Sequence, residues 1–217
     1  MIKYLINSLD ASGFLSRDLY SISSDLLVNN SRIVTERSLK KALKVKRKRE
    51  KVKTPEIDFG KGKFLSTKTY GNDRGFSCCF RQWKATHSHC SLLHGYSLGF
   101  KLVFECDSLD ERNWVMDFGG LKELKNWLEH NFDHTIVAAK DDPKLGELKA
   151  LEKKGLAVVR VFDNVGSEKF AEEVFKQMTI IIERTKYQKK ALNPTVRVKS
   201  VEVFEHDANS AIYERTG

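Results

Sequence analysis

A clean two-residue alternation in the middle of the chain constrains its fold more than any other feature. Residues 97–105 read SLGFKLVFE, and apolar side chains fall at every second position while mostly polar ones stand between them. In a β-strand such a set lies on one face. The pattern therefore predicts a half-buried strand, in a sheet covered on one side. Shorter strand-like pieces stand at residues 63–70, 75–80 and 156–162.

Two segments with helical spacing would supply that cover. Residues 118–129 and a longer stretch opening at Ser167 carry apolar side chains three and four positions apart. Residues 195–205 form a last strand whose alternation changes phase, which predicts a β-bulge near Ser200. The order strands, helix, strand, helix, strand predicts an α+β domain over residues 62–217, an antiparallel sheet with helices on one face.

The positive charge of the chain is confined to a short segment before this domain. The net charge is +9, yet residues 36–53 alone hold ten basic and two acidic side chains. This run has no aromatic residue for base stacking, so residues 36–61 are interpreted as an extended basic linker. Attraction to nucleic acid is left open only through this linker. Apolar residues at helical spacing in residues 1–35 predict a small helical hairpin as an N-terminal extension.

The composition bears on the cellular location of the protein and on the state of its cysteines. No apolar run approaches the roughly 18 residues of a membrane span, and the first residues show no secretory signal, so we expect a cytoplasmic protein without a membrane partner. The four cysteines lack the paired spacing of a structural zinc site, and a chain of this size does not need disulfides. We expect free thiols.

One segment concentrates residues with chemical potential. Cys90 lies among three of the six histidines, His87, His89 and His94. Neighbouring imidazoles can favour the reactive thiolate, which makes Cys90 the leading candidate for a nucleophile or base. The alternative is that Cys90 is a small buried residue and that the histidines are ordinary polar groups of a loop.

Two further positions are weaker candidates. Asp133 and His134 follow the first helix directly. Because adjacent side chains rarely hydrogen-bond each other, we expect these two to serve one external proton path. Glu205 ends the last strand, where its carboxylate could accept two parallel N–H bonds from a ring with an amidine-like edge. The alternative for Glu205 is an exposed carboxylate with no binding role.

Five ordered blocks of the sequence resemble one enzyme family, that of the pyruvoyltetrahydropterin and carboxytetrahydropterin synthases. The similarity covers about residues 64–215, and five blocks in order are far more specific than any single block. The spacing of Cys90 and His94 resembles the carboxytetrahydropterin branch, which belongs to queuosine and 7-deazaguanine biosynthesis. The blocks are FSCCF at residues 76–80, CSLLHGY at 90–96, MDFGGLK at 116–122, FDH at 132–134 and VEVFE at 201–205.

The resemblance implies a fold, a substrate and roles for individual residues. It implies the tunnelling fold, in which sheets from several subunits of a homo-oligomer join into a barrel with active sites between subunits. The implied substrate is the pterin 7,8-dihydroneopterin triphosphate. By position, Cys90 would abstract the proton, Asp133 and His134 would be its acid/base partners, Glu205 would anchor the pterin ring, and Ser167 would touch the pterin.

The implied zinc site is where this sequence departs from the family. The family holds Zn²⁺ with three histidines, but here Phe80 and Tyr96 stand in two of their places and His94 alone remains. Phenylalanine cannot bind a metal, and a phenol does so only after losing a proton that it keeps to about pH 10. A zinc site would need His87 or His89 to replace the missing ligands.

The residues therefore leave three functions open. The first is a lyase of the carboxytetrahydropterin synthase type. The second is a metal-free tunnelling-fold protein that binds a pterin or purine-like ring without the original lyase activity. The third is an assembly module in which the N-terminal hairpin and basic linker matter more than the pocket.

Overall fold

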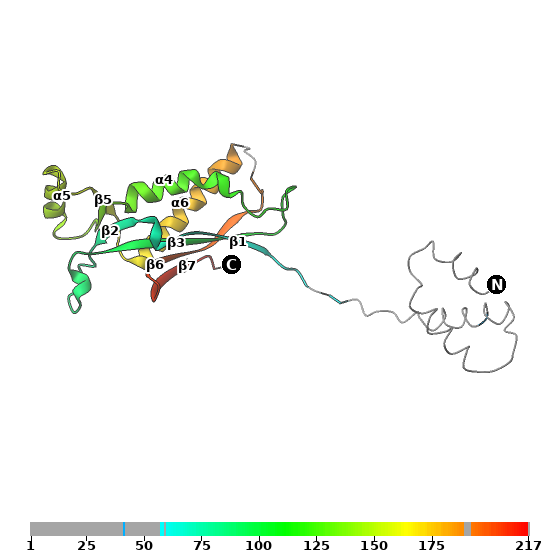
Figure 1. The fold of residues 1–217 in the computed structure, drawn as a ribbon, viewed down its shortest axis with the longest axis horizontal. Helices are drawn as coiled ribbons and strands as arrows, with labels where there is room; N and C mark the ends of the chain where they lie inside the picture. Colours follow the sequence, from blue (N-terminus) through cyan, green and yellow to red (C-terminus); the bar gives the residue numbers. More distant parts are fainter. Residues whose placement is uncertain (1–40, 42–56, 59, 189–191, 217) are drawn as a thin grey trace, which may run out of the picture. The chain divides into compact units, whose positions relative to one another are not determined.

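The computed structural model of the 217-residue chain describes residues 41, 57–58, 60–188 and 192–216. The helical hairpin predicted for residues 1–35 and most of the basic linker at 36–61 lie outside the described residues, so both stay predictions. The described elements all belong to the segment predicted to form the main domain (Figure 1). No helix in this described part is long and apolar enough to cross a membrane.

The strand predicted from the alternation is the centre of the sheet. β3 (His94–Cys106) pairs antiparallel along one edge with β2 (Phe76–Phe80) and then with β1 (Phe64–Tyr70). Along its other edge it pairs with β6 (Arg197–His206), which pairs in turn with β7 (Asn209–Glu214). β7 was not expected from the sequence. It extends the sheet beyond the strand predicted to be the last.

Two short strands make the sheet mixed rather than wholly antiparallel. β4 (Thr135–Ala139) pairs parallel to β2, and β5 (Val159–Phe162) pairs parallel to β4. Parallel neighbours need a crossover connection, and α5 (Leu145–Lys153) provides the one between β4 and β5. The sequence analysis missed β4 and α5 because both are short.

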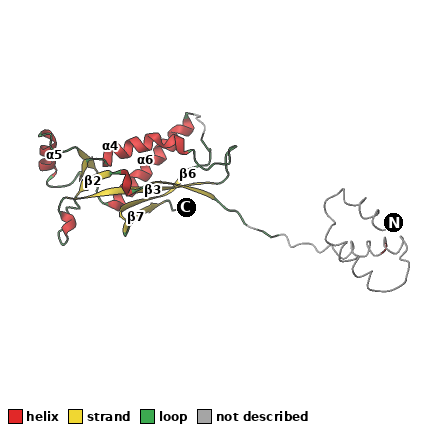
Figure 2. Cartoon of the chain, viewed as in Figure 1, coloured by secondary structure: helices red, strands yellow, loops and turns green. Residues whose placement is uncertain are grey.

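Two helices cover one face of the sheet, as predicted. α4 (Lys122–Phe132) and α6 (Ser167–Tyr187) lie together on the same side of the strands (Figure 2). The alternating apolar residues of β3 are fully buried beneath them, as are Phe132 and Phe170 from the helices. A short 3-10 turn precedes α4, and the Asp117 side chain accepts a hydrogen bond from the Gly119 amide at its start, 2.9 Å. The aromatic core fixes the elements that carry the candidate site.

The bulge predicted near Ser200 is present and decides which way the end of β6 faces. Val103 lies opposite Ser200, but the next residue of β3 lies opposite Val198, so Lys199 is the extra residue. After the bulge, Val201 and Val203 are the fully buried positions. Glu205 shares their alternation and faces the helix side of the sheet. Without the extra residue, Glu205 would point to the opposite face.

Candidate active site

Cys90 lies in a tightly closed turn after β2. It is the middle residue of a 3-10 turn, His89–Ser91, whose first amides are capped by Ser88: the Ser88 hydroxyl accepts from the Cys90 amide at 3.2 Å. The Cys90 carbonyl accepts from the Gln82 amide at 2.8 Å, which closes the loop on itself. The thiol is half-buried and makes no hydrogen bond to the described part of the chain. The backbone is thus fixed while the sulfur stays available.

An arginine clamp holds this turn against the end of β4. Arg81 donates two hydrogen bonds to the Asp142 carboxylate, at 2.8 and 3.0 Å, and a third to the Ser91 carbonyl at 3.2 Å. The Asp142 side chain is fully buried. Burial alone would raise the pKa of Asp142, but the Arg81 guanidinium holds it below its ordinary value. Next to it, Lys84 donates to Asp141 at 2.6 Å.

The sequence analysis missed this clamp because its partners are 61 residues apart. Arg81 follows β2 and Asp142 follows β4, and these two strands are parallel neighbours. Charged residues after adjacent parallel strands meet at one edge of a sheet. The positions of Arg81 and Asp142 could have indicated the clamp from the sequence, but only if β4 had been predicted.

Three rings face one another where β2 and β3 pair. Phe80 lies directly opposite His94, and Tyr96 lies two residues further along β3 on the same face. The ring centroids are 5.0 Å apart for Phe80 and His94, 5.5 Å for His94 and Tyr96, and 6.1 Å for Phe80 and Tyr96. The His94 Nδ1 lies 2.8 Å from the Leu92 carbonyl. This ring cluster occupies the positions that the family resemblance assigns to zinc ligands.

The residues of the ring cluster do not fit a zinc ion. His94 offers one nitrogen, because a carbonyl oxygen already faces the other. Burial raises the pKa of the Tyr96 phenol, and the nearby Glu205 and Cys90 raise it further, so the hydroxyl keeps its proton and is a poor ligand. Within the described ranges no three histidine, cysteine, aspartate or glutamate side chains come together as a metal site. His87 and His89 therefore do not replace the two missing ligands.

Glu205 and Ser167 form a hydrogen-bonded pair. The Ser167 hydroxyl, at the start of α6, donates to Glu205 Oε1 at 2.8 Å, and Ser167 is buried. Gly166 before it has φ of 115°, and a Cβ there would stand 2.7 Å from Nε2 of the Gln82 side chain. Gln82 in turn binds the Cys90 carbonyl through its backbone. Gln82 therefore connects the loop of Cys90 with the start of α6, where Ser167 holds Glu205.

Asp133 and His134 correct one expectation and lie apart from the thiol. Their side chains do hydrogen-bond each other, with Nδ1 of His134 2.6 Å from Oδ1 of Asp133. His134 also adopts a left-handed backbone, φ 53°, which is uncommon for a residue other than glycine. Within the described part of one chain, no hydrogen bond or ion pair joins either residue to Cys90. The exposed His134 precedes β4, three residues or about 10 Å along the strand from Val137, which lies beside Phe80.

Comparison with known proteins agrees with the fold and with the blocks of the sequence. The profile of the 6-pyruvoyl tetrahydropterin synthase family matches residues 71–216. The chain belongs to this family.

Curated relatives carry the name of one branch. A 6-carboxy-5,6,7,8-tetrahydropterin synthase of Rickettsia conorii is 34% identical over 59 residues, which is 27% of this chain and 43% of that protein. The enzyme of the same name from Rickettsia bellii is 30% identical over 94 residues, 41% of this chain and 67% of the relative. The Aquifex aeolicus enzyme is 34% identical over 65 residues, 30% and 40% of the two chains. The matched segments span less than half of the Rickettsia conorii and Aquifex aeolicus relatives.

Solved structures support the same fold at low sequence identity. An uncharacterized protein from Wolinella succinogenes superimposes with a TM-score of 0.58 at 19% identity, over 71% of this chain and 99% of that one. The 6-pyruvoyl tetrahydropterin synthase of Plasmodium vivax gives 0.50 at 15% identity, over 70% and 99%. These likenesses concern the α+β fold, in which a mixed sheet carries helices.

Proposed function

We propose that this chain is a lyase of the 6-carboxytetrahydropterin synthase type, acting on 7,8-dihydroneopterin triphosphate in queuosine and 7-deazaguanine biosynthesis. The observation that carries the proposal is the Ser167–Glu205 pair and its connection to the Cys90 loop. Through Gln82 and Gly166, the loop of the thiol meets the start of the helix that holds the carboxylate, although 115 residues separate Cys90 from Glu205 in sequence. The curated relatives named for this activity support the same assignment.

The proposed roles follow from hydrogen-bonding capacity. Glu205 has one oxygen engaged by Ser167, and the other makes no hydrogen bond to the described residues. A carboxylate held in this way can accept the two N–H donors of a pterin edge. Cys90 would then remove a proton from the side-chain carbon next to the ring, and the electron pair would enter the adjoining C=N bond.

The acid/base partners would come from another subunit. Asp133 and His134 lie apart from Cys90 within one chain, yet their mutual 2.6 Å hydrogen bond orients the imidazole, whose Nε2 faces outward on an exposed side chain. In a homo-oligomer with sites between subunits, this exposed pair would reach the thiol of a neighbour. No step of the proposed mechanism passes through zinc, because the ring cluster does not fit it.

A second function is favoured by the same ring cluster. Phe80 and Tyr96 stand where metal ligands are implied, so the chain would be a metal-free tunnelling-fold protein that binds a pterin or purine-like ring without the lyase step. This alternative keeps the role of Glu205 and removes that of Cys90.

Turnover and metal content measured on one sample separate these functions. Purified full-length protein is given 7,8-dihydroneopterin triphosphate, the products are identified by mass spectrometry, and zinc is measured by elemental analysis. We expect the carboxytetrahydropterin product, and we expect Cys90→Ala to abolish turnover while pterin binding persists. Cys79→Ala, which removes a half-buried thiol from β2, is the matched control and should keep activity. Pterin binding without any product would support the alternative and contradict the lyase.

A further inference from the structure

The ring cluster keeps the shape of a three-histidine metal site. Three imidazoles around one zinc, each with a metal–nitrogen bond of about 2.0–2.1 Å, place their ring centroids about 5 Å apart. The centroids of Phe80, His94 and Tyr96 are 5.0, 5.5 and 6.1 Å apart. The backbone of β2 and β3 therefore places three rings at about the spacing that three imidazoles around one ion would have, with different chemistry on each ring.

The three side chains now have different properties. Phe80 is fully buried and packs edge-on against Phe170, with centroids 5.1 Å apart, so it contributes an apolar wall. His94 Nδ1 faces the Leu92 carbonyl, which can only accept, so the neutral ring carries its proton on Nδ1 and its Nε2 is an acceptor. Neutral His94 therefore cannot donate a hydrogen bond to a ligand at this point.

Tyr96 has the remaining donor. Its side chain is half-buried, and the hydroxyl makes no hydrogen bond to the described part of the chain. A ligand that covers a phenol normally has to accept from it, since an unsatisfied buried hydroxyl is costly. A phenol has an ordinary pKa of about 10, so this hydroxyl carries its proton at neutral pH.

Tyr96 is also close to both proposed contacts of the substrate. Its phenol is close enough to both Glu205 and Cys90 for their charges to act on it, and its ring lies 6.3 Å from that of His206, next to Glu205. A ligand anchored on Glu205 by its ring and reaching toward Cys90 with its substituent would come close to Tyr96. The atom nearest the phenol would then belong to the hydroxylated side chain of the pterin.

We propose that the Tyr96 hydroxyl donates a hydrogen bond to a side-chain oxygen of the bound pterin, and so stabilises the charge that develops there when Cys90 removes the neighbouring proton. This inference rests on the proposed function. It assigns to a tyrosine the electrophilic role that a metal would have, and it uses no metal. A single donor of this kind contributes about 10²–10³-fold to rate in other enzymes.

Replacing the hydroxyl tests the inference through turnover. Tyr96→Phe removes the donor and keeps the ring, and we expect kcat/KM to fall by about 10²-fold, with most of the loss in kcat. Tyr187→Phe, at the exposed far end of α6, removes a phenol hydroxyl away from the site and should change neither constant. Turnover of Tyr96→Phe within threefold of wild type would overturn the inference.

A binding comparison keeps the inference testable if the protein has no lyase activity. Wild type and Tyr96→Phe are titrated with 7,8-dihydroneopterin, which carries side-chain hydroxyls, and with 6-methyl-7,8-dihydropterin, which lacks them. We expect the substitution to weaken the first ligand about tenfold and the second less than twofold. Discrimination without turnover would sink the proposed function and support the role of Tyr96. Equal effects on both ligands, or no binding of either, would overturn that role.

Building a three-histidine site tests the inferred spacing of the side chains at positions 80, 94 and 96. The double variant Phe80→His and Tyr96→His presents three imidazoles, and we expect it to bind one zinc per chain, while wild type and each single variant bind less than a tenth of that. Stoichiometric zinc in the wild type, lost in His94→Ala, would overturn the inference. A folded double variant that binds no zinc would contradict the geometry on which it depends.

Discussion

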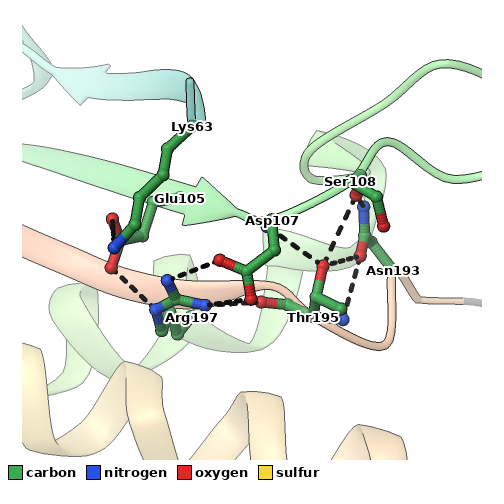
Figure 3. Close-up of polar contacts among 7 residues, drawn as sticks. All are labelled: Lys63, Glu105, Asp107, Ser108, Asn193, Thr195 and Arg197. Carbon is green, nitrogen blue, oxygen red and sulfur yellow. Dashed lines mark hydrogen bonds and ion pairs between the residues drawn. The ribbon is translucent and has the colours of Figure 1, made fainter. Parts of the chain in front are cut away.

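The two ends of β3 carry polar clusters of opposite character. At the end near Cys106, Arg197 donates to Glu105 at 2.7 Å and to Asp107 at 3.0 Å, and Lys63 lies 3.4 Å from the second Glu105 oxygen (Figure 3). Thr195 adds its hydroxyl and carbonyl to the same network. Both oxygens of the buried Glu105 have a cationic partner. This end has little capacity left for a ligand.

The end that begins at His94 leaves its polar groups available. The Cys90 thiol, the Tyr96 hydroxyl and the second oxygen of Glu205 have no hydrogen-bond partner among the described residues, although each belongs to a half-buried side chain. Neither the Tyr96 hydroxyl nor this Glu205 oxygen is among the buried atoms without a partner in the described part, so solvent reaches both and a ligand could replace that solvent. The saturated cluster therefore stabilises the fold, whereas the cluster at the other end of the same strand keeps hydrogen-bonding capacity for the ligand proposed above.

The largest effect on stability is expected at the saturated end. Arg197→Ala leaves the buried Glu105 carboxylate with Lys63 alone, and we expect the free energy of unfolding to fall by about 3 kcal/mol. Pterin affinity should stay within twofold of wild type. Urea denaturation and a pterin titration measure the two quantities. A large loss of affinity with unchanged stability would reverse the assignment of the two ends.

The arginine clamp should contribute both to stability and to activity. Asp142→Asn weakens the charge-assisted contacts of Arg81, and we expect a stability loss of about 2 kcal/mol. Because Arg81 also holds the Ser91 carbonyl next to Cys90, kcat should fall about tenfold while KM changes little. The matched control is Asp141→Asn in the same turn, which loses an exposed ion pair and should change neither value much. Unchanged kcat in Asp142→Asn would limit the clamp to a structural role.

A smaller effect is expected for the hydroxyl that supports Glu205. Ser167→Ala removes one hydrogen bond from the carboxylate, and we expect pterin affinity to fall about fivefold, or roughly 1 kcal/mol. Ser200→Ala, at a partly buried serine of β6, is the control. A titration that finds equal affinities for wild type and Ser167→Ala would show that the Glu205 carboxylate does not depend on this hydrogen bond.

The smallest effect is a change in the pH dependence of stability. Burial alone would raise the pKa of Glu105, but Arg197 and Lys63 hold it below its ordinary value of 4.5. Such a group stabilises the fold above pH 4.5, and this contribution is lost as the pH falls through the lower folded pKa. We therefore expect the decline in unfolding free energy below pH 4.5 to be shallower in Glu105→Gln than in wild type. Identical slopes of unfolding free energy against pH in the two proteins would contradict the lowered pKa of Glu105.

The part of the fold that follows from local patterns could be predicted from the sequence. The alternation of β3 and the phase change near Ser200 both describe how a strand sits between core and solvent, so they give the central strand and the bulge directly. β4, α5 and β7 were missed because each is short and is stabilised by its neighbours more than by its own pattern. The parallel pairing of β4 with β2 followed from none of the local signals.

The candidate site could be predicted residue by residue but not as an arrangement. The family resemblance singled out Cys90, Glu205 and Ser167, and the contact between Ser167 and Glu205 appears only when α6 packs over β6. The Asp133–His134 contact comes with a left-handed backbone at His134 that no residue type in the motif requires. The sequence analysis treated Tyr96 as a lost ligand, and its unused hydroxyl became visible only in the structure.

The central claim is that the unsaturated end of β3 binds a pterin ring through Glu205. Fluorescence titration of the full-length protein with 7,8-dihydroneopterin tests it most directly, with Glu205→Gln as the test variant and Glu202→Gln, the neighbouring carboxylate of β6 that binds Lys101 and Ser210, as the control. The account predicts saturable binding to wild type and Glu202→Gln, and at least about 10²-fold weaker binding to Glu205→Gln. Equal affinity in Glu205→Gln and wild type, or no binding to any of the three, would contradict it.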